Sequence, residues 1–180
     1  MLQIRSNAFE TNSSSAHAMW IKSPEFIQPF PEEKVFTPKF NTFDVELDDV
    51  SSSEEFINAC VSNFKAGEFL DLVWMTVAFF PKLYSDLPAK IDAMLKPYNI
   101  RIEWAFDDKS TSEVRSKLKD YGCAFEDFGA VLNEVVDYRE PLASLVLNGV
   151  FEWEHQLNDT TIEDTFGKRD GYLRFAVDTH

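Results

Sequence analysis

The sequence lacks the features that direct a chain into or across a membrane. No apolar run is long enough to span a bilayer, and the N-terminus does not have the basic-then-apolar pattern of a secretory signal. We therefore expect a soluble, cytoplasmic protein with no membrane partner.

Cysteine, histidine and glycine are also scarce, with two, three and six residues in 180 positions. Cys60 and Cys123 lie far apart among apolar neighbours, which predicts buried free thiols in a reducing compartment. The spacing of cysteine and histidine matches no zinc site. The glycines form neither a phosphate-binding loop, a dinucleotide fingerprint nor a Gly-x-Ser-x-Gly elbow. The sequence thus predicts no metal and no cofactor.

Basic residues are also few. The 17 lysines and arginines are outnumbered by 31 aspartates and glutamates, giving a net charge of −14. This argues against direct binding of nucleic acid, which requires a basic surface. The acidic residues are spread along the chain, which is typical of a solvated surface. An alternative is an acidic module that binds and inhibits a host protein.

The order of predicted elements indicates one α+β domain covering residues 1–180. No linker or repeat divides the chain, and predicted strands lie at both ends with helices between them. We expect a mixed or mostly antiparallel sheet with helices packed on one face, in which the first and last strands are neighbours. The predicted regions are a strand–loop–strand (1–22), a Pro/Phe-rich connection (23–42), a helical middle (52–136), and a C-terminal hairpin and strand (142–178).

Helix signals are clear in the middle of the chain. Ser52 and Glu55 have capping-box spacing, and Gly67 is the predicted end of that helix. Residues 68–80 are apolar almost all round, which predicts a central core helix. Further helices are predicted at 87–96 after an Asp86 cap, from the Ser110/Glu113 capping-box pair to Gly122, and at 125–136 with an acidic outer face.

Alternating apolar residues predict strands at 43–47, 99–106 and 173–177. Asn148-Gly149 between apolar runs predicts a tight hairpin. The second strand of that hairpin places His155 on the same face as Phe151 and Trp153. A single histidine on such a face is more often a core residue than a catalytic one.

The Pro-rich connection carries four phenylalanines, Phe26, Phe30, Phe36 and Phe40. Proline disfavours regular helix and central strand, so an extended, packed segment is predicted. If the protein acts by binding a host protein, these rings are the predicted exposed patch.

The densest group of polar side chains lies near the N-terminus, between the predicted strands Met1–Ile4 and Ala18–Ile21. Thr11–Ser15 is predicted to be a loop whose hydroxyls and backbone N–H groups could form an anion site. His17 then opens the second strand and shares a face with Met19 and Ile21.

The segment Phe9-Glu10-Thr11-Asn12-Ser13-Ser14-Ser15-Ala16-His17 resembles the signature of a family of uncharacterised bacterial and bacteriophage proteins. The resemblance covers roughly the first twenty residues. Glu154-His155-Gln156 is similar to an acidic-His-Gln step that such proteins carry in their second half, whereas the ending Val177–His180 departs from their pattern. The family has no settled activity, so the resemblance implies a site but not a reaction.

These observations lead to three hypotheses for the N-terminal segment. The first is a binding or catalytic site for a phosphorylated or nucleotide-like small molecule, in which His17 or His155 acts as general base; His155 has such a role only if it converges with His17. The second is a host-protein interaction module, and the third is a purely architectural loop whose serines cap a turn or helix. In the first hypothesis the predicted catalytic residues are Glu10, Ser13, Ser14, Ser15, His17 and His155, and the predicted ligand-binding residues are Arg5, Thr11 and Asn12.

Overall fold

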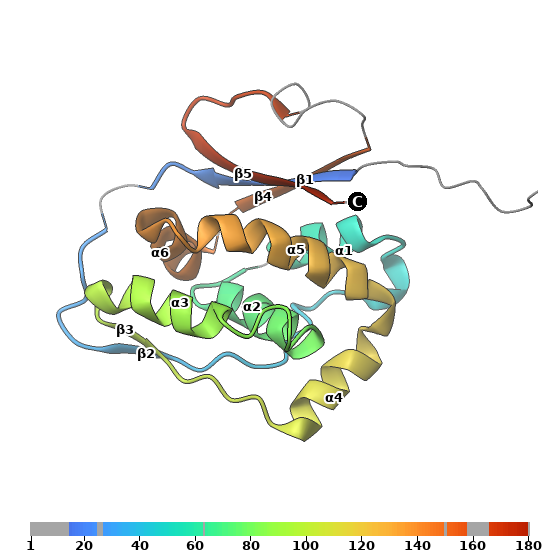
Figure 1. Ribbon diagram of the computed structural model, residues 1–180, viewed down its shortest axis with the longest axis horizontal. Helices are drawn as coiled ribbons and strands as arrows, with labels where there is room; N and C mark the ends of the chain where they lie inside the picture. Colours follow the sequence, from blue (N-terminus) through green and yellow to red (C-terminus); the bar gives the residue numbers. More distant parts are fainter. Residues whose placement is uncertain (1–14, 25–26, 63, 150, 158–165, 180) are drawn as a thin grey trace, which may run out of the picture.

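A three-stranded antiparallel sheet, in the order β4-β1-β5, brings the beginning and the end of the chain together (Figure 1). The computed structural model describes residues 15–24, 27–62, 64–149, 151–157 and 166–179. The strands are β1 (Ser15–Lys22), β4 (Phe151–Leu157) and β5 (Tyr172–Thr179), with β2 (Lys34–Phe36) and β3 (Ile100–Ile102) forming a separate parallel pair. This α+β architecture confirms the predicted fold class.

The central strand, β1, sets the register of the sheet. His17 lies opposite His155 in β4, and Met19 lies opposite Phe175 in β5. The predicted strand at Ala18–Ile21 therefore shares a sheet with the last strand, β5, whereas the predicted first strand, Met1–Ile4, lies outside the described residues. Met19 and Ile21 are buried in the main core, as expected from their shared face.

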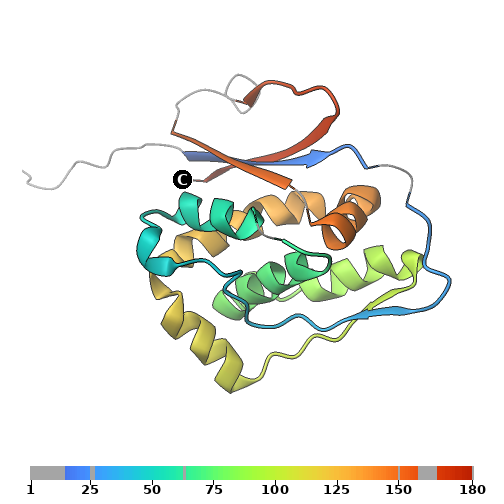
Figure 2. The ribbon, with the colours of Figure 1, turned by 180° about the vertical axis from the view of Figure 1, so that it is seen from behind.

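Helices cover one face of the sheet (Figures 1 and 2), and within the described residues there are six α-helices. Their bounds are α1 Ser53–Val61, α2 Glu68–Phe79, α3 Leu87–Leu95, α4 Asp108–Lys117, α5 Gly122–Val135 and α6 Arg139–Asn148. Helices α1 and α5 contact the sheet directly. Every residue of α2 from Phe69 to Ala78 is buried, which confirms the predicted core helix.

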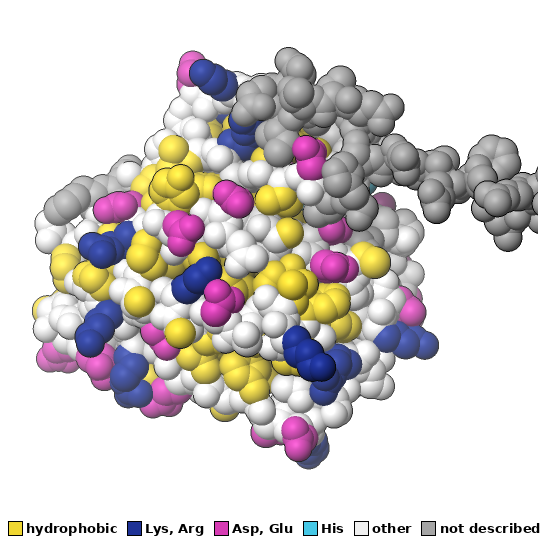
Figure 3. Space-filling model, viewed as in Figure 1, with side chains coloured by type: hydrophobic (Ala, Val, Ile, Leu, Met, Phe, Trp, Pro, Cys, Tyr) yellow, Lys and Arg dark blue, Asp and Glu magenta, His cyan; other side chains and the backbone are white. Residues whose placement is uncertain are grey.

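The opposite face of the sheet is covered by the segment that leads into β5. Trp20 is buried together with Ala18 and Phe166, and the guanidinium of Arg169 lies 4.4 Å from the centroid of the Trp20 ring. Arg169 also forms ion pairs with Glu152 and Glu154. Figure 3 shows one side of the molecule, on which acidic side chains are scattered among basic ones rather than gathered in one patch.

The predicted hairpin at Asn148-Gly149 is wrong. The apolar residues before it belong to α6, and Gly149 ends that helix with a φ of 66° and an N–H that donates to the carbonyl of Leu145 at 2.8 Å. Asn-Gly favours positive φ, which suits a helix C-terminus as well as a hairpin turn. The face prediction is nevertheless confirmed, because Phe151 and Trp153 are buried with His155 beside them.

Several predicted helix boundaries also need correction. Helix α1 ends at Val61, and Gly67 instead precedes α2 with a φ of 87°, where a Cβ would come within 2.5 Å of the Phe36 ring. The Ser52 cap is confirmed, since its Oγ accepts the Glu55 N–H at 3.1 Å, but the Glu55 carboxylate accepts from Ser51 instead of completing the box. The predicted start of the helix after Ser110 also needs correction.

The N-cap of α4 is Asp107, which accepts the N–H of Ser110, so the helix begins earlier than the Ser110/Glu113 spacing predicts. Gly122 begins α5 rather than closing the preceding helix. Asp86 stands at the N-cap of α3, as predicted, but its carboxylate pairs with Lys90 and makes no capping hydrogen bond.

Two predicted strands are shorter or absent. Phe43 and Asp44 form a turn with positive φ, in which Asn41 Oδ1 accepts the Phe43 N–H at 2.8 Å, and Leu47 begins a short 3-10 helix, Leu47–Asp49. The strand predicted at 99–106 is only Ile100–Ile102. Its remaining aromatics are held by ring stacking, with Phe106 lying between Trp74 and Trp104.

The connection is packed, as predicted. Phe30, Phe36 and Phe40 pack partly buried against the core, and Phe26 lies outside the described residues. Of the two cysteines, Cys60 is buried as predicted, whereas Cys123 is exposed. None of the helices described here has the length and apolar character needed to cross a membrane.

Candidate functional site

His17 and His155, whose convergence is the condition for a role of His155, lie side by side. The register of β1 and β4 places His17 directly opposite His155, and their rings stack with centroids 4.7 Å apart and planes inclined by 19°. Both side chains project from the helix-facing side of the sheet, because each shares a face with buried apolar residues of its own strand. The condition that the sequence left open is therefore met.

The pair opens into a cavity of about 260 Å³ between the sheet and helices α1 and α5. We call it the histidine-pair cavity. Ile57, Ala124 and Trp153 form its apolar walls. Its polar lining consists of Ser15, His17, Ser52, Glu54, Asp127 and His155.

Each histidine has its own carboxylate partner. His155 Nδ1 lies 3.1 Å from Glu54 Oε2 at the start of α1, and His17 Nε2 lies 3.4 Å from Asp127 Oδ2 in α5. In a neutral imidazole the proton is favoured on the nitrogen that faces a carboxylate. His155 then donates through Nδ1 and keeps an acceptor lone pair on Nε2, and His17 has the opposite tautomer.

Burial controls the charge of His17. The side chain is only 6% exposed, and burial together with the neighbouring charge of His155 lowers its pKa to about 4. His17 is therefore neutral at pH 7.

One atom of the pair has no partner within the described part of the chain. His17 Nδ1 is buried and makes no hydrogen bond to any described residue. A buried polar atom without a partner lowers the stability of the fold, and such atoms are uncommon in native proteins. His17 Nδ1 is therefore a buried acceptor that the described residues leave unsatisfied.

The cavity brings together only part of the predicted site. His17, His155 and Ser15 lie in it, although Ser15 belongs to β1 rather than to the predicted loop. The other predicted residues lie outside the described residues: Arg5, Glu10, Thr11, Asn12, Ser13 and Ser14. Their roles remain predictions.

Three residues of the cavity were not predicted as site residues. Ser52 and Glu54 appeared only as part of a helix start, and Asp127 was assigned to the acidic outer face of its helix. Asp127 instead turns toward His17. Glu54 lies in the first turn of α1 and Asp127 lies on one face of α5. Neither position has a local sequence pattern that distinguishes a site residue from a solvated carboxylate.

The lining is not a metal site. Among the residues that the structure describes, no group of three or more His, Cys, Asp or Glu side chains is arranged to hold a metal ion. The chemistry open to this set is hydrogen bonding and proton transfer, with an imidazole as the exchanging group and a carboxylate to orient it.

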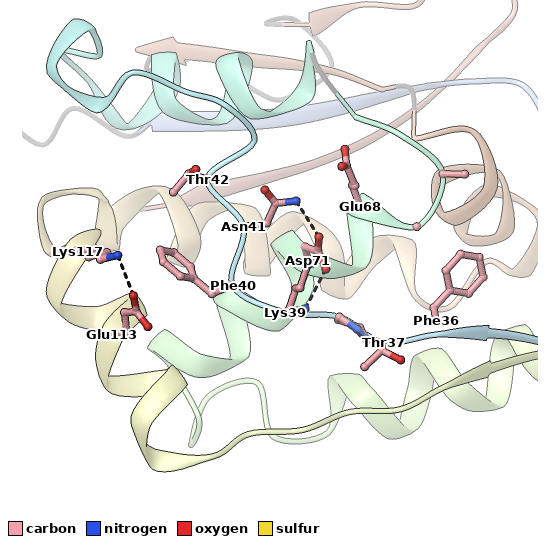
Figure 4. A pocket seen from close by; sticks show the side chains of 13 residues that line it. Phe36, Thr37, Lys39, Phe40, Asn41, Thr42, Glu68, Asp71, Glu113 and Lys117 are labelled. Atoms are coloured by element: carbon pink, nitrogen blue, oxygen red, sulfur yellow. Dashed lines mark hydrogen bonds and ion pairs between the residues drawn. The ribbon is translucent and has the colours of Figure 1, made fainter.

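A larger pocket of about 630 Å³ lies between the connection and helices α2 and α4 (Figure 4). We call it the connection pocket; its central polar group is Asp71. The Asp71 carboxylate accepts the Lys39 N–H and the Asn41 Nδ2–H, both at 2.9 Å, and thereby fixes the connection to α2. Across the pocket, Lys117 pairs with Glu113 at 2.8 Å. The polar side chains of the connection pocket are thus already paired with each other. The connection pocket is therefore the weaker candidate for a binding site, although it is the larger of the two.

Comparisons with protein-family models, curated proteins and solved structures give no match to this chain. The assignment of the site therefore rests on its own geometry.

Proposed function

We propose that the histidine-pair cavity binds a small phosphorylated molecule and that His155 exchanges a proton with it. The observation that carries the proposal is the convergence of two histidines, each with its own carboxylate, in a cavity that also contains two hydroxyls.

The proposed roles follow from burial and hydrogen bonding. His155 is half-buried, and its Nδ1 is engaged by Glu54, so its Nε2 is the nitrogen we assign to the ligand. Glu54 is a positioning residue, which holds the ring and stabilises its protonated form. His17 stays neutral and offers its ring face to His155.

The proposed ligand class rests on the hydroxyls and on the start of α1. Ser15 and Ser52 can donate to phosphoryl oxygens, and the N-terminus of a helix of nine residues lies beside them. The lining also has two carboxylates, so the predicted contact from Arg5 is needed to balance the charge of a bound anion. The volume of about 260 Å³ is below the range typical of sites for drug-sized ligands, roughly 300–1,000 Å³, which favours a compact phosphorylated molecule over a whole nucleotide.

The test is a thermal-shift screen with inorganic phosphate, sugar phosphates, phosphorylated amino acids and nucleoside monophosphates. Wild type is compared with His155→Gln, which removes the exchanging group at a half-buried position. Lys117→Gln, which removes a charge from the connection pocket, serves as the matched control. We expect a compound that raises the melting temperature of wild type and of Lys117→Gln but not of His155→Gln.

A positive compound is then incubated with wild type, and the release of inorganic phosphate is measured. If no phosphorylated compound stabilises wild type, or if His155→Gln keeps the full shift, the proposed function is wrong.

A further inference from the structure

The two stacked rings of the histidine-pair cavity have four nitrogen atoms, and three of them are already engaged or buried. His17 Nε2 lies 3.4 Å from the Asp127 carboxylate, and His155 Nδ1 lies 3.1 Å from that of Glu54. His17 Nδ1 is buried without a partner among the described residues. The fourth nitrogen is His155 Nε2, and it differs from the other three in its access to small molecules.

His155 Nε2 is open to solvent. Within the described residues, the His155 ring makes its hydrogen bond through Nδ1, and the one buried side-chain nitrogen or oxygen atom that lacks a partner is His17 Nδ1. Nε2 has no partner there and is not a buried atom, so its position is one that solvent reaches. Since His155 lines the histidine-pair cavity, a molecule in that cavity can also reach Nε2.

Glu54 fixes the chemical character of this nitrogen. A proton on Nδ1, directed at the Glu54 carboxylate, leaves the lone pair of the ring on Nε2. A histidine oriented in this way by a third group has the arrangement of a nucleophile, and histidine is among the side chains that form covalent intermediates. The two nitrogens of an imidazole point in divergent directions, so a group bonded to Nε2 leaves the contact with Glu54 in place.

The surroundings of the ring suit a phosphoryl group on Nε2. After the transfer the ring is cationic, and Nδ1–H then donates to Glu54 in a hydrogen bond between ionised groups, which is stronger than a neutral one. The His17 ring, stacked at 4.7 Å, is neutral at pH 7 and adds no second positive charge. Ser52 Oγ accepts the Glu55 N–H through a lone pair, so its O–H remains a donor for a phosphoryl oxygen.

The lining of the cavity favours an acyl phosphate as the donor. A phosphate ester needs an acid to protonate its alkoxide leaving group, and the described lining contains no lysine or arginine, while the accessible histidine nitrogen is the nucleophile itself. The carboxylate that leaves an acyl phosphate is a weak base and needs no proton. A small acyl phosphate also suits the cavity volume of about 260 Å³.

We propose that His155 Nε2 accepts the phosphoryl group of a small acyl phosphate and forms a phosphohistidine. The Nε2 lone pair makes the new N–P bond, the P–O bond to the acyl group breaks, and the carboxylate leaves with the electron pair of that bond. The Nδ1 proton stays on the ring, so the step needs no further reactant. This inference rests on the proposed function: it names the ligand class of that site and gives the same lone pair a phosphoryl group to accept.

The test is the labelling of the full 180-residue chain with acetyl phosphate. Samples are quenched in alkali, which preserves phosphohistidine, and are analysed by intact-mass spectrometry and peptide mapping. We expect one phosphoryl group on the peptide that contains His155, labile in acid and stable in alkali. The same chain unfolded in urea is the reference for the unassisted reaction, and His155 should be labelled faster in the folded chain than in urea.

Two variants at the site and one outside it make the test specific. His155→Asn keeps an N–H that can replace Nδ1–H toward Glu54 but has no second ring nitrogen, so we expect no label. Glu54→Gln keeps a hydrogen-bonding oxygen but removes the charge, and we expect labelling about tenfold slower than in wild type at a nearly unchanged melting temperature. Lys117→Gln, in the connection pocket, is the matched control and should be labelled as fast as wild type.

The outcomes separate this step from the proposed function. A label on a serine, a label on His155 that forms no faster in the folded chain than in urea, or a labelled His155→Asn would overturn the phosphohistidine. If phosphorylated compounds raise the melting temperature of wild type but acetyl phosphate leaves no label, the covalent step is wrong and the proposed binding stands. If neither effect is observed, the proposed function itself is wrong.

Discussion

The histidine-pair cavity and the connection pocket both contain a buried polar side chain, but they differ in how that side chain is satisfied. His17 is 6% exposed and Asp71 is 7% exposed. Both oxygens of Asp71 accept hydrogen bonds that hold the connection in place, whereas Nδ1 of His17 has no partner among the described residues. The two side chains are thus equally buried but differ in whether their polar atoms are satisfied by described residues.

Burial perturbs the two groups in opposite directions. It raises the pKa of Asp71, although the hydrogen bonds from Asn41 and Lys39 act against that shift, and it lowers the pKa of His17. The hydrogen-bond donors offset the free-energy cost of burying the Asp71 carboxylate. For His17, the cost of burying a charge is avoided only because the ring stays neutral. The comparison predicts that changes at Asp71 affect stability, while changes around His17 affect pH dependence and binding.

The largest effect is expected from Asp71→Ala. The change leaves the Lys39 N–H and the Asn41 amide without their acceptor, and we expect a loss of about 2–4 kcal/mol in the free energy of unfolding. Asp71→Asn, which keeps one acceptor oxygen, should lose less. Urea denaturation measures both. A variant Asp71→Ala as stable as wild type would show that this carboxylate does not hold the connection.

The second-largest effect is expected on the stability of the fold at low pH. His17 has a pKa of about 4 in the folded chain against an ordinary value of 6.5, so below pH 6.5 the unfolded chain binds a proton that the folded chain does not. The folded state is therefore expected to lose stability as the pH falls from 6.5 to 4, by up to about 3 kcal/mol, with no further change from this group below pH 4.

The matched variant for this titration is His17→Phe, which keeps an aromatic ring but cannot bind a proton. The difference in unfolding free energy between wild type and His17→Phe, followed from pH 7.5 to 4, isolates the contribution of the histidine. A difference that is constant over this range would contradict the lowered pKa.

A smaller effect is expected at Ser52, which has both a structural and a proposed binding role. Its Oγ caps α1 by accepting the Glu55 N–H, so Ser52→Ala should lower the unfolding free energy by about 1 kcal/mol. Ser52→Asn retains a capping oxygen and should restore most of that stability. If the asparagine variant is stable yet its ligand-induced thermal shift is reduced, the hydroxyl contributes to binding as well as to the cap.

The smallest effect on stability is expected from Glu54→Gln. The carboxylate is partly exposed, and ion pairs of this kind contribute about 0.2–1 kcal/mol. If the proposed site is correct, binding of the phosphorylated ligand should nevertheless weaken, because the carboxylate that orients the His155 ring is removed. A thermal melt with and without ligand gives both quantities. An unchanged ligand shift would remove Glu54 from the proposed site.

Local patterns determined much of the secondary structure. The near-continuous apolar run of α2, the spacing of apolar residues in α3 and the alternation in β5 each record how one segment is buried, and these elements form where the sequence predicts them. The class of fold and the faces of His17 and His155 follow from the same patterns. These features are readable because a helix or strand repeats its burial within a few residues.

Tertiary structure decided the features that depend on distant partners. Gly149 ends a helix rather than a hairpin because the preceding apolar residues pack in α6, and Gly67 is required where the Phe36 ring approaches. Glu54 and His155 are 101 positions apart, and neither has a local signal for the other. The sequence by itself determined the class of fold, most of the helices and the strand faces of the two histidines, but it assigned the segment of α6 to a hairpin. Only the assembled sheet and helices decided that the two rings stack and which carboxylates meet them, because those contacts are made between residues that no local pattern relates.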